Sequence, residues 1–298
     1  MIKNLTKESF DNYYEEINSE LYNLFPKDFE NYLRTEWSDK VKFHKKISNL
    51  SNYPLTVIST IQNLQISFLE KLGKKGCYWY IKKKNGSYGR NITITKNPIT
   101  FFGSLIRTSD INNYVIQKEI LSDNYKGKKY DYRVYLLIIK INGKINYYYY
   151  DDYIVRFCYE KEDEAKPRNV YNSITNHHIY SLQKLDRNFY CFNKDFEKNH
   201  QEKIVNLNES FITLFSLHEK DFINLLKDNE FRILGMDYLV EKNSNKLFIL
   251  EMNTVPGVFY SNSEEDFFIK YNNFHKVLIC DLNNLIFNNK SEKWIKIS

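Results

Sequence analysis

Residues 235–257 read GMDYLVEKNSNKLFILEMNTVPG, two apolar stretches joined by a polar turn. This pattern predicts an antiparallel hairpin, with a three-residue turn expected at 243–245. With that turn, Asp237 lies directly opposite Glu251. Because side chains alternate along a strand, Glu251 and Asn253 share a face. The segment therefore predicts two carboxylates and an amide oxygen close together on a sheet.

Asp237, Glu251 and Asn253 form a candidate metal site. Hard oxygen donors of this kind suit Mg²⁺, with phosphate oxygens completing its octahedron. Two carboxylates placed directly across a sheet repel each other, and a cation relieves that repulsion. The alternative is an edge hairpin whose acids face water. The Pro-Gly pair that follows the Glu-x-Asn pattern after two intervening residues favours the metal site.

The segment KYDYRVY, residues 129–135, carries three charges on a predicted strand. Lys129, Asp131 and Arg133 are spaced by two residues, so they lie on one face. Such a face is costly to bury unless its charges serve a ligand or one another. The alternative is a ladder of surface ion pairs. Arg156, within YIVRFC on the returning strand, is either part of a structural ion pair or an anion clamp.

A glycine-bearing loop, KKNGSYGR at 83–90, follows a strand predicted at 77–82. Glycine lets backbone N–H groups approach an anion closely, and Lys82 adds positive charge. The loop is a candidate phosphate cover. Loops of this composition also occur in ordinary hairpins, and a run of lysines is usual on a solvated face.

The rest of the pattern predicts a mixed α+β chain with mostly antiparallel strands. Asn142-Gly143 is a strong hairpin signal between strands expected at 131–140 and 145–153. Further strands are expected at 91–95 and 115–120. Helical spacing of apolar residues predicts helices at 10–25, at 55–72, over most of 196–230 and from about 263. The last residues, 288–298, are expected to be a helix end and a tail.

Composition narrows the class of protein. The 25 Tyr and 21 Phe among 298 residues must pack, which excludes disorder as the main state. No apolar run approaches the roughly 20 residues of a membrane span, and the first ten residues lack the apolar region of a secretory signal. We therefore expect no membrane association. The four cysteines show no CxxC spacing, which favours a reducing, cytoplasmic location.

The net charge is +6, from 43 basic and 37 acidic residues. This mild excess allows an acidic macromolecular partner without requiring one. We expect no nucleic-acid partner.

Seven segments, taken in order, resemble the tubulin tyrosine ligase-like family of the ATP-grasp superfamily. They are WYIKKKNGSYGRNI, VIQKEI, KKYDYRVYLL, YIVRFC, SITNHHI, LGMDYLV and FILEMNTVPG, and they span about residues 77–260. The sequence departs from the family pattern at two positions. Lys83 stands where proline is usual, and Glu119 stands where an aromatic residue is usual.

The resemblance implies an ATP-grasp fold, in which two α/β lobes with mostly antiparallel sheets clamp ATP beside a short N-terminal lobe. We expect these lobes at 1–66, 67–124 and 125–298. The implied reaction joins a free amino acid (Glu, Tyr or Gly, with Glu the commonest) to a carboxylate of a protein through an acyl-phosphate. The implied acceptor is tubulin or another protein with an acidic tail, and the implied cofactors are ATP and Mg²⁺.

The resemblance also implies roles for individual residues. Nucleotide contacts are implied for Lys82, Arg90, Gln117, Lys118 and Ile120. Catalytic contacts with the triphosphate and the reacting carboxylate are implied for Lys129, Asp131 and Arg133. Arg156 is implied as a catalytic residue that helps to bind the acyl-phosphate or the incoming amino acid. Thr175 and Asn176 are implied beside the amino acid, and Asp237, Glu251 and Asn253 as Mg²⁺ ligands. A lysine that the family places in its N-terminal lobe is not identifiable from the sequence.

Two other functions stay open. Another ATP-grasp enzyme, either a small-molecule ligase or a kinase, would share the metal ligands, and release of ADP without an amino acid would favour the kinase. A catalytically degenerate module could instead bind a protein tail. The intact set of Asp237, Glu251 and Asn253 argues against that module, because an acidic cluster is costly without its cation.

Overall fold

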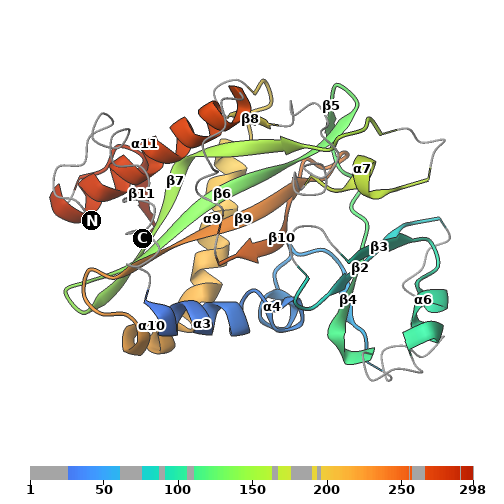
Figure 1. Cartoon of the computed structure of the whole chain (residues 1–298), viewed down its shortest axis with the longest axis horizontal. Coiled ribbons are helices and arrows are strands. Elements are labelled where there is room, and N and C mark those ends of the chain that lie inside the picture. Colours follow the sequence, from blue (N-terminus) through green and yellow to red (C-terminus); the bar gives the residue numbers. More distant parts are fainter. Residues whose placement is uncertain are drawn as a thin grey trace.

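The computed structural model describes residues 26–60, 76–86, 91–105, 111–162, 167–175, 190–192, 196–254, 256, 266–288 and 290–297. These residues form two antiparallel sheets with helices packed against them (Figure 1). The α+β class with mostly antiparallel strands is therefore confirmed. The helix predicted at 10–25 lies outside the described residues. No helix in the described part of the chain is long and apolar enough to cross a membrane.

The smaller sheet has four strands in the order β1-β4-β2-β3. The strands are β1 (Thr56–Ile58), β2 (Trp79–Lys83), β3 (Ile92–Thr95) and β4 (Tyr114–Lys118). Helix α6 (Pro98–Leu105) and the short 3-10 turn η2 (Ile111–Asn113) connect β3 to β4. Trp79, Ile81 and Ile116 form the centre of its core. Three of these strands confirm the sequence predictions.

The prediction of a helix across 55–72 is wrong where β1 lies. Val57 pairs with Ile116 of β4 in an antiparallel ladder. The apolar run Thr-Val-Ile contains three β-branched residues, which suit a strand, and periodicity alone does not separate a short buried strand from a helix. The lobe boundaries at 66/67 and 124/125 stay predictions.

The larger sheet follows the path β10-β9-β6-β7-β11, with β5 paired to β6 and β8 paired to β7. Its strands are β5 (Asn124–Tyr125), β6 (Lys128–Ile141), β7 (Lys144–Phe157), β8 (Tyr190–Phe192), β9 (Phe231–Val240), β10 (Leu247–Asn253) and β11 (Trp294–Ile297). The hairpin predicted at Asn142-Gly143 is confirmed, and both turn residues have positive φ, 51° and 75°. Such a turn matches the twist of the two long strands that it joins.

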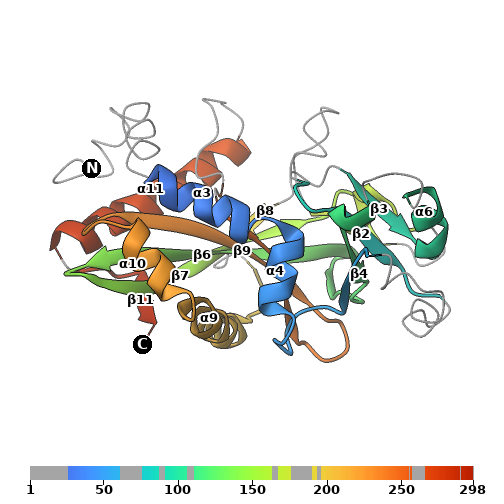
Figure 2. The ribbon, with the colours of Figure 1, turned by 90° about the horizontal axis from the view of Figure 1, so that it is seen from below.

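Helices cover both faces of the larger sheet. Helix α9 (Gln201–Ser216) and helix α11 (Asp266–Asn288) lie on opposite faces (Figure 2). The hydrophobic core on the α9 side of the sheet also includes residues of α3 (Lys27–Glu36), α4 (Lys40–Ile47) and α10 (Glu219–Leu225). The helices predicted within 196–230 and after 263 are confirmed.

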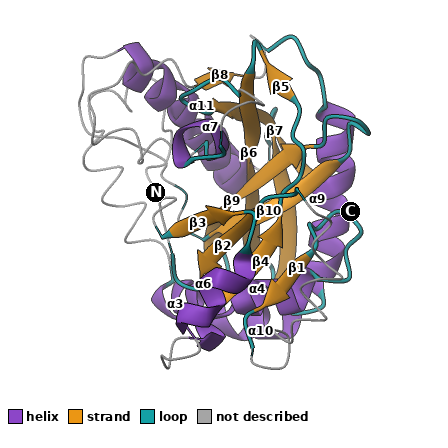
Figure 3. Ribbon diagram, turned by 90° about the vertical axis from the view of Figure 1, so that its right-hand side faces the viewer, coloured by secondary structure: helices purple, strands orange, loops and turns teal. Residues whose placement is uncertain are grey.

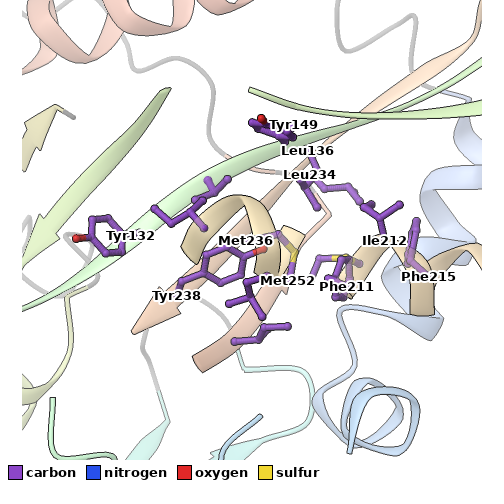
Figure 4. Close-up of a cluster of buried hydrophobic side chains, with 14 of the residues drawn as sticks. Tyr132, Leu136, Tyr149, Phe211, Ile212, Phe215, Leu234, Met236, Tyr238 and Met252 are labelled. Atoms are coloured by element: carbon purple, nitrogen blue, oxygen red, sulfur yellow. The ribbon is translucent and has the colours of Figure 1, made fainter. Parts of the chain in front are cut away.

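Successive side chains of β6 point alternately into two hydrophobic cores, one on the α9 side of the sheet and one on the α11 side. On one face, Tyr132 and Leu136 belong to the same buried cluster as Phe211 of α9 and Met236 and Tyr238 of β9 (Figure 4). Tyr135, Leu137 and Ile139 pack instead with residues of α11 such as Leu278 and Leu282. Burial on both sides explains why the middle of β6 is an almost continuous apolar run.

The tail expected at 288–298 is wrong over Trp294–Ile297, which forms strand β11 and pairs with the tyrosines Tyr147–Tyr150 of β7. Asp281 of α11 accepts hydrogen bonds from the backbone N–H groups of Glu292, Lys293 and Trp294 at 3.1–3.3 Å. The strand therefore depends on a tertiary partner as well as on its own residues.

The two sheets meet at one end of the larger sheet. Strand β6 begins beside β5, at the end nearest the smaller sheet (Figure 1). Seen from that side, the smaller sheet lies in front of the larger one (Figure 3), and Lys129 Nζ of β6 lies 5.3 Å from the ring centroid of Tyr80 in β2. Lys82 of β2 is close enough to the larger sheet to interact electrostatically with Lys129 of β6, Asp237 of β9 and Glu251 of β10.

Candidate active site

Charged side chains of four neighbouring strands meet on one face of the larger sheet. The register pairs Asp131 with Arg156, Arg133 with Asp237, and Asp237 with Glu251. The predicted cluster on one face of β6 is confirmed by these cross-strand pairs. The four strands therefore deliver the charges side by side.

Two carboxylates and two guanidinium groups alternate in this cluster. Arg156 donates to both carboxylate oxygens of Asp131 at 2.7 Å and lies 3.0 Å from Asp237 Oδ2. Arg133 donates to Asp237 from Nε at 2.5 Å and from Nη2 at 3.1 Å. Burial alone would raise the pKa of Asp237, but Arg133 and Arg156 outweigh it and lower that pKa to about 2. Asp237 is therefore ionised at neutral pH.

Gly235 makes room for this cluster. A Cβ added there would lie 3.0 Å from Arg133 Cδ and 3.0 Å from Pro256 Cβ. Any larger residue would push against a side chain that is held by two hydrogen bonds to Asp237. The Gly-x-Asp spacing at 235–237 thus has a packing reason as well as a chemical one.

The predicted pairing of Asp237 with Glu251 is confirmed, but the predicted three-residue turn is wrong. Val240 pairs with Leu247, which is one residue out of step with a turn at 243–245. A bulge between Ile249 and Glu251 then shifts the register back by one residue. The longer loop and the bulge compensate, so the two carboxylates still face each other.

The predicted metal ligands lie together at the end of β9 and β10. Asn253 donates from Nδ2 to Asp237 Oδ2 at 3.3 Å, and Glu251 is the residue paired with Asp237. Among the described residues, no group of three His, Cys, Asp or Glu side chains could hold a metal ion. The candidate set here has two carboxylates and an amide, which is a donor set that suits a hard divalent cation. Asp237 shares its oxygens with the two arginines.

Lys82 and Gln117 bring the smaller sheet into the site. Lys82 Nζ donates to Gln117 Oε1 at 2.7 Å, and Gln117 is in turn held by Thr56 at 3.3 Å. Burial lowers the pKa of Lys82 to about 8; Glu251 opposes this shift, and Lys40 and Lys129 add to it. An anion bound nearby would therefore stabilise the charged form of Lys82.

The other predicted site residues lie at different distances from the charged cluster. The buried Lys129 ammonium lies 5.3 Å from the ring centroid of Tyr80 in β2, so it sits between the sheets. Thr175 donates from Oγ1 to Asp131 Oδ2, directly after the short helix α7 (Val170–Ser173). Lys118 donates its backbone N–H to Leu55 O at 2.8 Å, and Ile120 is half-buried just past β4. Arg90 and Asn176 lie outside the described residues.

Lys40 is a site residue that the sequence did not reveal. It is the first residue of α4, and its Nζ donates to Gly86 O at 2.5 Å and lies 3.8 Å from Glu251 Oε2. Asp39 caps the helix by accepting hydrogen bonds from Val41 N and Lys42 N, and that motif was readable from the sequence. Nothing local indicated that Lys40 reaches the site.

Comparison with known proteins agrees with this geometry. The family model described as "Tubulin-tyrosine ligase family" matches residues 12–291. Tubulin glycylase 3F of Tetrahymena thermophila is 27% identical over 251 residues, which cover 74% of this chain and 26% of the relative. Tubulin polyglutamylase ttll-11 of Caenorhabditis elegans is 24% identical over 224 residues, covering 63% and 30%.

A probable beta-tubulin polyglutamylase of Tetrahymena thermophila is 25% identical over 264 residues, covering 75% of this chain and 21% of the relative. The chain therefore spans 21–30% of the length of these three relatives. The family match covers most of the chain and includes every strand that carries the charged cluster. The chain belongs to the tubulin-tyrosine ligase family.

Proposed function

We propose that this chain is an ATP-dependent ligase that joins a free amino acid to a carboxylate of a protein acceptor. The observation that carries the proposal is the convergence of two sets of groups. Lys82 and Gln117 come from one sheet, and the cluster around Asp237 comes from the other. A triphosphate held between them meets cations on both sides.

The chain's own residues have separable tasks in this reaction. Asp237, Glu251 and Asn253 would hold Mg²⁺, which supplies positive charge to the phosphates when bound. Arg133 and Arg156 offset negative charge that develops on the transferred phosphoryl group. Asp131 holds Arg156 in place through two hydrogen bonds. The acceptor carboxylate takes the γ-phosphoryl group of ATP, with release of ADP, to give an acyl-phosphate. The amine of the amino acid then attacks the acyl carbon, loses a proton and displaces inorganic phosphate, which leaves an amide bond.

We propose an acidic tail of a tubulin-type protein as the acceptor and glutamate, glycine or tyrosine as the donor, in the cytoplasm. Support comes from the relatives, whose names describe tubulin glycylases and tubulin polyglutamylases. Lys126, in the turn before β6, and Lys128, at the start of β6, add positive charge at the surface that suits such a tail.

The test incubates the purified chain with Mg²⁺, ATP and tubulin, adding glutamate, glycine or tyrosine singly. ADP release and the masses of the tubulin tails are measured on the same samples. A mass increase matching one amino acid residue, present with the wild type and absent with Glu251→Gln, supports the ligase. Glu251 is a third exposed, so we expect this substitution to leave the fold intact.

Two outcomes would redirect the proposal. ADP release without any mass increase, and without dependence on the amino acid, would favour a kinase. Failure to bind ATP would favour a module that binds a protein tail without catalysis.

A further inference from the structure

A largely buried arginine outside the cluster described above joins the two sheets. Arg168 lies between β7 and α7, and its Nε donates to Glu119 Oε1 at 3.0 Å. Its Nη2 forms a second ion pair with Glu162 Oε1. The three side chains are 11%, 7% and 14% exposed, respectively. Two acidic groups therefore converge on one guanidinium in a largely dry setting.

The two acids belong to different parts of the molecule. Glu119 directly follows β4 and donates its backbone N–H to Tyr78 O at 2.9 Å, which ties it to the smaller sheet. Glu162 donates its backbone N–H to Gly127 O at 2.7 Å, at the turn that leads into β6 of the larger sheet. Arg168 thus bridges the two sheets at the point where the chain passes between them.

Arg168 also borders the segment that carries Thr175. The next residue, Asn169, caps α7 by accepting from the N–H groups of Tyr171 and Asn172. Its own N–H is bonded to the Asn172 side chain, which completes a capping box. Four residues of helix then lead to Thr175 and its hydrogen bond to Asp131. Arg168 is therefore joined to Thr175 by a short segment that the capping box and the bond from Ile174 N–H to Val170 O hold in place.

On this geometry, and resting on the function proposed above, we propose that Arg168 is a positioning residue. Through Glu119, it couples nucleotide binding at residues 117–120 to the placement of Thr175 beside Asp131. The bound nucleotide restricts the motion of the end of β4. The ion pair between Glu119 and Arg168 then restricts the motion of residues 169–175, where the donor amino acid is expected.

The test follows backbone amide exchange with deuterium, with and without Mg²⁺ and a non-hydrolysable ATP analogue. In the wild type, we expect the analogue to slow exchange at 115–120 and also at 169–175. In Arg168→Met and in Glu119→Gln, slowing at 115–120 persists, and slowing at 169–175 falls at least threefold. Glu162→Gln is the matched control, because it alters the same guanidinium but leaves the link to Glu119, and it should behave like the wild type.

A role confined to stability would give a different pattern, since it would loosen both segments with and without the analogue. If Arg168→Met does not fold, the near-isosteric Glu119→Gln alone tests whether slowing at 169–175 depends on the ion pair. Equal slowing at 169–175 in the wild type and both variants overturns the coupling and leaves the ligase proposal intact. Absence of slowing at 115–120 in the wild type contradicts the ligase proposal itself, and the coupling fails with it.

Discussion

At the scale of the residue, Asp237 has two roles that mutation can separate. It neutralises two buried arginines, and it is a proposed metal ligand. We expect Asp237→Ala to lower the free energy of unfolding by about 3–5 kcal/mol, because it leaves buried guanidinium charge without its partner. Glu251→Gln should cost under about 1 kcal/mol, because Glu251 is partly exposed and its nearest cation is 3.8 Å away.

Urea unfolding of both variants measures this difference. Both are expected to abolish ligation, so activity alone does not separate the two roles. Equal losses of stability for the two variants would contradict the assignment of Asp237 as the counter-charge of the cluster.

Lys82 predicts a pH dependence of nucleotide binding. Its pKa is lowered to about 8 by burial, and a bound anion raises that pKa again. Binding should therefore take up protons above about pH 8, and affinity should fall as the pH rises from 7 to 9.5. Calorimetry at pH 8.5 in two buffers of different ionisation enthalpy should give different binding enthalpies for the wild type.

Lys82→Arg is the control for this linkage, because a guanidinium stays protonated throughout this range. Its binding enthalpy should not depend on the buffer. If the wild type also shows no dependence on the buffer, Lys82 does not contact the nucleotide phosphates. Lys82 also affects the stability of the protein without ligand. Because its pKa is lower in the folded state, the unfolded state holds more protons on Lys82 between pH 8 and 10.5. The contribution of Lys82 to the free energy of unfolding therefore rises with pH in this range.

At the scale of the element, Gly235 sets the packing of β9 against Arg133 and Pro256. We expect Gly235→Ala to destabilise the protein by about 1–3 kcal/mol, because the new methyl group has no room. Gly103→Ala in helix α6 is the matched control. Nothing lies within 4 Å of its added Cβ, so the change should be neutral or stabilise by roughly 0.5–1 kcal/mol. Thermal unfolding of the two variants would refute the packing argument if Gly235→Ala were the milder change.

Helix α11 and strand β11 depend on each other through Asp281. Asp281→Ala removes the acceptor of three backbone N–H groups, and we expect a loss of about 1–3 kcal/mol. Amide exchange at 294–297 should accelerate while exchange in β6 changes little. Asp152→Ala, which removes the partly exposed pair with Lys293 and one acceptor for the backbone N–H of Tyr153, should cost less than the Asp281 change and leave exchange at 294–297 unaltered. Unchanged exchange at 294–297 in the Asp281 variant would show that pairing with β7 alone holds the strand.

At the scale of the whole molecule, the site is closed by three parts: α4, the smaller sheet and the larger sheet. A nucleotide bound by all three should stabilise them together, by about 2.7 kcal/mol at a concentration 100 times its Kd. We expect Lys40→Met to reduce this stabilisation, because Lys40 contacts both Gly86 and Glu251. Lys45→Met, an exposed change on the same helix, should leave it unaltered. Equal thermal shifts in the two variants would place α4 outside the nucleotide site.

The local sequence pattern was sufficient to predict much of the fold and part of the candidate site. Alternation, the Asn-Gly turn and the spacing of charges predicted the long strands, their faces and the meeting of Asp237 with Glu251. These features depend on residues close in sequence, where the geometry of one strand or hairpin decides the outcome. Even there the turn was one residue longer than predicted, and the bulge after Ile249 restored the register.

Only the tertiary structure decided the remaining features. The three-residue strand at Thr56–Ile58 and the four-residue strand at Trp294–Ile297 form because each has a neighbouring strand to pair with, β4 and β7 respectively. Lys40 and Arg168 reach their acidic partners across 211 and 49 residues of chain, respectively. A short strand takes its hydrogen bonds, and a buried charge takes its counter-charge, from whichever elements the fold brings alongside, so neither is encoded in the residues next to it.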